Sequence, residues 1–167
     1  MKRVFLLIPF ILIIGCGEGI EPIVNTSGFS GKIVFIGVWP DSITRTHLVI
    51  FENPLNSASD FSLGNLKFIS VEIPYGVNEF QFSSRDTSVI PGNRLFSPGE
   101  YSYVAVAQSK TPDVSLNRAD WNVVGVYYAN EDTTQPGKLI ISENTFVQNI
   151  NITCDFNNPP PQPPGGN

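Results

Sequence analysis

The sequence has few of the residues from which catalytic and metal sites are usually built. It holds two cysteines and a single histidine among 167 residues, too few for a disulfide framework or a histidine-rich metal site. Basic residues are also scarce, with 10 Lys and Arg against 15 Asp and Glu and a net charge of −5. This balance argues against nucleic acid or anionic headgroups as the main ligand, because both attract basic proteins.

Long hydrophobic runs are missing as well. The apolar run at residues 4–14 is broken by Pro9, and it is too short for a membrane-spanning helix, which needs about 20 residues. Lys2 and Arg3 precede it, and a basic start before a short apolar run is typical of an export signal. We therefore expect residues 1–15 to be a signal peptide.

Residues 13–16, Ile-Ile-Gly-Cys, resemble the lipobox of bacterial lipoproteins. The resemblance implies cleavage after Gly15 and lipidation of Cys16, so that acyl chains anchor the mature protein in a membrane. Gly17, in place of aspartate after the cysteine, implies transport to the outer membrane and hence a location in the cell envelope. An ordinary signal peptide and an uncleaved N-terminal anchor are the alternatives.

The other cysteine and the histidine have no partners in the sequence that would give them chemistry. Cys154 follows Ile152 in an alternating pattern, so we expect a buried hydrophobic side chain rather than a reactive or metal-binding thiol. We expect His47 to be packed or at the surface rather than a metal ligand or general base. Nucleophile elbows, phosphate-binding loops and calcium loops are also absent from the sequence. We therefore expect no catalytic residue, no metal site and no cofactor, and a protein that is not an enzyme.

The rest of the sequence is a succession of short β-rich runs separated by Gly, Pro, Asn and Ser clusters. Apolar residues on both faces of residues 44–51 predict a central strand. Gly125 within a strand predicts a bulge or a close backbone approach. The expected strands are residues 31–39, 44–51, 66–73, 77–82, 97–107, 121–128, 137–142 and 146–156.

Seven or eight strands without a long amphipathic helix predict an all-β fold. We expect a single antiparallel β-sandwich at residues 31–156, with a closed barrel as the alternative. Residues 16–30 are small, polar and Gly-rich, which predicts a flexible tether. Residues 157–167 are rich in proline, which lacks a backbone donor, so we expect a polyproline-like or disordered tail.

Three segments carry a second resemblance: Gly-Lys-Ile-Val-Phe at residues 31–35, Pro-Gly-Glu-Tyr-Ser-Tyr at 98–103, and Pro-Gly-Lys-Leu-Ile at 136–140. Their order is similar to that in prealbumin-like domains, which include carboxypeptidase regulatory-like and related immunoglobulin-like sandwiches. Such domains are mostly accessory folding, adhesion or ligand-binding modules. The resemblance therefore implies a non-catalytic role. We expect the partner to be an envelope protein or a glycan.

Aromatic residues are the remaining candidates for a binding site. Trp39, Trp121 and Tyr75 could form a platform for sugars, because flat rings with polar tips suit pyranose faces. The alternative is core packing, since β-sandwiches normally bury a tryptophan. The sequence thus predicts a membrane-anchored lipoprotein that presents a non-catalytic β-sandwich, with carbohydrate binding through strand-end aromatics as the alternative.

Overall fold

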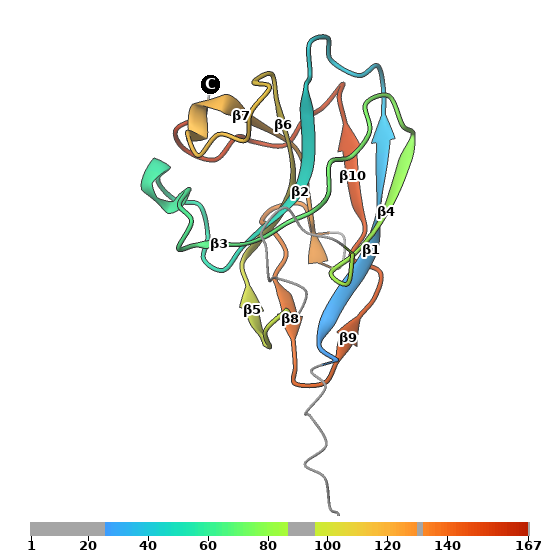
Figure 1. Cartoon of the computed structure of the whole chain (residues 1–167), viewed down its shortest axis with the longest axis vertical. Helices are drawn as coiled ribbons and strands as arrows, with labels where there is room; N and C mark the ends of the chain where they lie inside the picture. Colours follow the sequence, from blue (N-terminus) through green and yellow to red (C-terminus); the bar gives the residue numbers. More distant parts are fainter. Residues whose placement is uncertain (1–25, 87–95, 130–131, 167) are drawn as a thin grey trace, which may run out of the picture.

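The structure, a computed structural model, describes residues 26–86, 96–129 and 132–166. This part of the chain is all-β, as predicted, with ten strands and two short 3₁₀ helices (Figure 1). Within these ranges, no helix has the length and apolar character needed to cross a bilayer. The elements are β1 (Gly28–Ile36), β2 (Arg45–Phe51), η1 (Ala58–Asp60), β3 (Leu66–Ile69), β4 (Glu79–Ser83), β5 (Gly99–Tyr101), β6 (Tyr103–Ser109), η2 (Arg118–Asp120), β7 (Trp121–Val126), β8 (Leu139–Ile141), β9 (Phe146–Val147) and β10 (Ile152–Asp155).

The strands form two four-stranded sheets and one two-stranded sheet, none closed on itself. The first sheet has the order β10-β1-β4, with β9 also paired to β1, and the second has the order β3-β2-β6-β7. β5 pairs with β8. β1 is parallel to β9 and β10, whereas the other pairs among the described strands are antiparallel. The sequence predicted antiparallel pairing throughout, and the structure differs in the two parallel pairs that β1 forms with β9 and β10.

β2 lies inside the second sheet, and six of its seven residues are buried. Alternate side chains of a strand point to opposite faces. Leu48 and Ile50 accordingly enter one hydrophobic cluster, while Val49 and Phe51 enter another. The prediction of a central strand with two apolar faces is confirmed.

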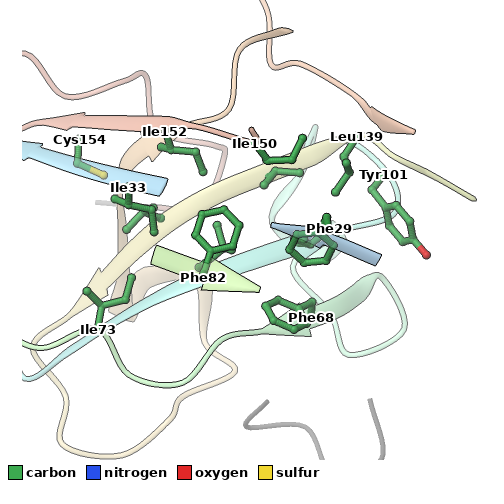
Figure 2. Packing of buried hydrophobic residues seen from close by; sticks show 14 of the residues in the cluster. Phe29, Ile33, Phe68, Ile73, Phe82, Tyr101, Leu139, Ile150, Ile152 and Cys154 are labelled. Carbon is green, nitrogen blue, oxygen red and sulfur yellow. The ribbon is translucent and has the colours of Figure 1, made fainter. Parts of the chain in front are cut away.

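The two clusters lie on opposite faces of the second sheet. The inner cluster joins this sheet to the first sheet and includes the large side chains that Figure 2 shows packed together. Its buried members are Phe29, Ile33, Phe35, Trp39, Leu48, Ile50, Phe68, Ile73, Phe82, Phe96, Tyr101, Val104, Val106, Val124, Leu139, Ile141, Ile150, Ile152 and Cys154. The buried members of the outer cluster are Val49, Phe51, Leu55, Ile69, Tyr103, Ala105, Ala107, Trp121, Val123 and Val126.

The two sheets come into close contact where β7 passes β10, at Gly125. A Cβ atom on Gly125 would lie 2.5 Å from Cys154 Sγ and 2.9 Å from Ile152 Cγ2, so the position requires glycine. The register between β6 and β7 also shifts between Val106 and Ala107, beside this glycine. The sequence predicted a bulge or a close backbone approach at Gly125, and the close approach is confirmed, since a Cβ there would lie 3.1 Å from the Thr153 carbonyl oxygen.

Two segments predicted as continuous strands are broken, which raises the number of strands from seven or eight to ten. Residues 97–107 divide at Ser102, whose amide donates to the Glu52 carbonyl (3.0 Å) between β5 and β6. Tyr101 therefore joins the inner cluster and Tyr103 the outer one, whereas in one continuous strand residues two positions apart share a face. Residues 146–156 divide near Asn149, whose φ of 65° is left-handed.

The start of the first sheet also differs from the prediction. β1 begins at Gly28, whose amide donates to the Thr145 carbonyl (3.1 Å). Residues 28–30 of the predicted tether therefore belong to the sheet. The predicted signal peptide and residues 16–25 lie outside the described residues.

Candidate functional site

The predicted aromatic platform is not formed by Trp39. Its side chain is 8% exposed, and its Nε1 donates to the Val77 carbonyl (3.1 Å). The ring packs against Phe35, with centroids 4.6 Å apart, and against Tyr75 at 5.2 Å. Tyr75 is 56% exposed. Of this group, only Tyr75 presents its ring to solvent.

Trp121 lies in the outer cluster, apart from Trp39 in the inner one. It is 5% exposed, and its Nε1 donates to the Ser115 carbonyl (2.8 Å). The two tryptophans therefore share no surface, and sugar stacking by this pair does not fit the structure. The reason is that loops cover both rings and satisfy both indole donors.

His47 is buried on the outer face of β2, as a packed side chain. Its Nδ1 lies 3.0 Å from the Ser70 carbonyl, and its ring meets Trp121 with centroids 6.1 Å apart. Burial lowers the pKa of His47, because the charged imidazolium is poorly solvated there. Among the described residues, no group of three His, Cys, Asp or Glu side chains could hold a metal ion.

Cys154 is fully buried in the inner cluster, which confirms the prediction of a packed hydrophobic residue. Burial raises the pKa of its thiol well above the usual range, so the reactive thiolate is disfavoured. Gly15 and Cys16, the predicted cleavage and lipidation positions, lie outside the described residues.

The outer face of the first sheet carries an open polar hollow of about 740 Å³. It lies where β1 passes from β9 to β10, and there the Asn151 side chain accepts the Lys32 amide (3.1 Å). Gly31 shapes it, because a Cβ there would lie 2.0 Å from the Ile150 carbonyl oxygen. Its polar walls include Ser30, Gln81, Ser83, Gln148, Asn149 and Asn151.

The most specific feature of the described surface is the proline-rich segment, residues 157–166, which runs beside β7 (Figure 1). The Val123 amide donates to Gln162 Oε1 (2.9 Å), and Gln162 Nε2 donates to the Val123 carbonyl (2.7 Å). One side-chain amide thus makes the pair of bonds that a neighbouring strand would make. The sequence predicted a polyproline-like or disordered tail, and the structure places residues 157–166 against the second sheet.

Arg118 holds the same segment from η2. Its guanidinium donates to the Trp121 carbonyl and, over 3.0 Å, to the Pro163 carbonyl. Arg118 is 5% exposed, and burial lowers its pKa. Gly166 lies against it, because a Cβ on that glycine would be 2.5 Å from Arg118 Nη2. The segment therefore closes over a buried cation.

A groove of about 480 Å³ remains between the segment and the sheet. Burial raises the pKa of both Tyr103 and Tyr128, so their phenols stay protonated and can donate hydrogen bonds. The walls include Tyr103, Val126 and Tyr128 on one side and Pro160, Pro161 and Pro163 on the other. Aromatic and proline surfaces of this kind suit extended, proline-rich chains.

Sequence reasoning missed Gln162, Arg118 and Val123. The composition of residues 157–167 argued only that prolines cannot donate to a sheet. The signal that could have found the site is the lone glutamine among five prolines, since its amide supplies both a donor and an acceptor. Arg118 gives no comparable signal, because its burial depends on contacts across 45 residues of chain.

Comparison of the chain with protein-family models, with curated proteins and with solved structures finds no match in any of the three.

Proposed function

We propose that this chain is a lipoprotein of the bacterial cell envelope that presents a non-catalytic β-sandwich for binding or envelope organisation. Residues 1–15 are removed, Cys16 carries the lipid, and residues 17–27 form the tether. Gly17 directs the protein to the outer membrane. The partner is an envelope protein or a glycan, and no cofactor takes part.

The observation that carries this proposal is the order of segments at the start of the chain. Lys2 and Arg3 precede an apolar run that ends in Gly15 and Cys16, and a strand begins at Gly28. Eleven residues, 17–27, lie between Cys16 and Gly28, enough to span at most about 40 Å when extended. The other cysteine, Cys154, is fully buried, which leaves Cys16 as the residue for modification.

The arrangement of the sheets supports the assignment to the prealbumin-like or immunoglobulin-like sandwiches. The two four-stranded sheets share the inner cluster, and facing sheets with a common core are the defining feature of a sandwich. Figure 1 draws the start of β1 and the β1–β2 connection at opposite ends of the molecule. A lipid at Cys16 would then leave the end with the β1–β2 connection, where Tyr75 packs against Trp39, directed away from the membrane.

The test is metabolic labelling of the full-length chain with a fatty acid in a bacterial host. We expect the wild type to carry the label and to fractionate with the outer membrane. Cys16→Ser should lose both the label and the membrane association. The matched control is Cys154→Ala, which removes the buried thiol and should keep the label. A labelled, membrane-bound Cys16→Ser protein would contradict the proposal.

Carbohydrate binding is a second candidate, and the polar hollow on the first sheet favours it. Side-chain amides and hydroxyls from three segments line this hollow, and such groups can both donate to and accept from sugar hydroxyls. A glycan array with the wild type, Gln81→Ala and Gln148→Ala tests this site, and Tyr75→Ala tests the exposed ring separately. An array without signal for the wild type would exclude it.

A further inference from the structure

The edge of β7 that does not pair with β6 is bound by the side chain of Gln162, which makes the hydrogen bonds that a neighbouring strand would make. β7 pairs with β6 on one side, and an unpaired strand edge is a template for another extended chain. Here the Gln162 amide makes two hydrogen bonds, of 2.9 and 2.7 Å, with the amide and the carbonyl of Val123. The backbone of this edge therefore already binds one segment of the chain, residues 157–166, through the Gln162 side chain.

Other contacts fix the register of that segment. Arg118 donates to the Pro163 carbonyl (3.0 Å), which places the guanidinium one residue beyond Gln162. Gly165 lies so close to Ala58 that a Cβ on it would come within 2.6 Å of the alanine Cβ. Prolines elsewhere in the segment leave no amide donor unsatisfied. The contact thus uses the glutamine side chain, the proline positions and the glycines of the segment. We therefore expect the β7 edge to bind this sequence in preference to other extended chains.

The connection to the domain is short and polar. The Asn157 amide donates to Asp155 Oδ1 (2.9 Å), and the Asn158 amide donates to the Asp155 carbonyl (3.1 Å). This turn directly follows β10, which ends at Asp155, so it is the hinge at which the segment would leave the domain. If two copies of the chain exchange this segment, each contact within one chain is replaced by the same contact between the two chains. Such dimers therefore form with little loss of free energy.

We propose that the β7 edge is a peptide-binding groove for extended Pro-Gln-Pro-Pro-Gly-Gly segments, and that its partner in trans is the proline-rich segment of a second copy. Gln162 of one chain then pairs with the β7 edge of the other, and the reverse contact closes a two-fold dimer. This inference does not depend on the lipid anchor, so either proposal can fail alone.

The first test measures hydrogen exchange at the Val123 amide in the full-length chain. Gln162→Ala should speed exchange about tenfold or more, because the Val123 amide loses its acceptor, Gln162 Oε1. Gln148→Ala, an exposed glutamine elsewhere, is the control and should leave this amide unchanged. A synthetic peptide with the sequence of residues 157–166 should restore protection to the Gln162→Ala chain, and the same peptide with alanine for glutamine should not.

The second test measures the molar mass of the full-length chain over a range of concentrations. The wild type should form dimers as the concentration rises, and Gln162→Ala should remain monomeric. If Gln162→Ala leaves hydrogen exchange at Val123 unchanged, or if the peptide does not restore protection, the β7 edge is not a peptide-binding site. Restoration together with a wild type that stays monomeric would overturn the second copy as the partner.

Discussion

The two faces of the β3-β2-β6-β7 sheet are both buried, but they are covered in different ways. Strands of the first sheet cover the inner face through fully buried side chains such as Phe29 and Ile33. Loops, short helices and the proline-rich segment cover the outer face, held by the polar side chains of Asn65, Arg118 and Gln162. The inner face thus depends on packed volume, and the outer face on hydrogen bonds that each contribute about 1 kcal/mol.

Removing volume from the inner cluster should have the largest effect. Phe29 is fully buried and meets Phe68 and Phe96 edge-on, with centroids 5.2 and 4.9 Å apart. We expect Phe29→Ala to lower the free energy of unfolding by about 3–5 kcal/mol, measured by chemical denaturation. Val38→Ala, at a side chain 87% exposed, should change it by less than about 0.5 kcal/mol. A loss below about 1 kcal/mol for Phe29→Ala would contradict tight packing.

Adding volume where the sheets meet should cost less. Gly125→Ala places a methyl group 2.5 Å from Cys154 Sγ, and overpacking of this kind costs about 1–3 kcal/mol. Gly64→Ala is the control, because no atom lies within 4 Å of its Cβ position. Combining Gly125→Ala with Cys154→Ala should give a loss smaller than the sum, and additive losses would argue against contact between the two positions.

Disturbing the outer face should have a smaller, local effect. Arg118→Met keeps an apolar side chain but removes the donors to the Trp121 and Pro163 carbonyls. We expect a loss of about 1–2 kcal/mol, with faster hydrogen exchange in β7. Lys110→Met, at an exposed cation, should change neither quantity. A loss as large as that of Phe29→Ala would remove the distinction between the faces.

The outer face should also respond to pH through His47, the only histidine. Its pKa is lowered from 6.5 by burial, so the unfolded chain takes up a proton at a higher pH than the folded chain. Stability should therefore be full above about pH 6.5 and fall as the pH decreases, by at most about 1.4 kcal/mol per unit. Denaturation curves at pH 7.5, 6.5 and 5.5 measure this slope. His47→Gln should flatten it, and an unchanged slope would assign the effect to another group.

The sequence predicted most of the inner face and little of the outer one, for a physical reason. Alternation in residues 45–51 gives the two faces of β2 directly, and Gly125 marks a close approach because its neighbours are β-rich. The alternating apolar pattern does not predict the break at Ser102, because the pattern continues while the chain passes from the β5–β8 sheet to the second sheet.

The candidate site shows the same limit. From the sequence, Trp39 and Trp121 could serve either a sugar platform or the core, and sequence alone does not give the loops that bury them. The contact of Gln162 with Val123 joins positions 39 residues apart through one side-chain amide, and no periodic pattern encodes such a bond.

The parallel pairing of β1 has a consequence for the order of folding. Ile33 in β1 lies opposite Ile152 in β10, so β1 waits for 119 further residues before this parallel neighbour exists. Contacts between residues this far apart in the sequence slow folding, because the chain loses the entropy of closing a large loop before the paired strands stabilise it. A chain still emerging from the ribosome can pair β1 with β4, but it cannot complete the first sheet, so the other edge of β1 stays unpaired until the last strand has been synthesised.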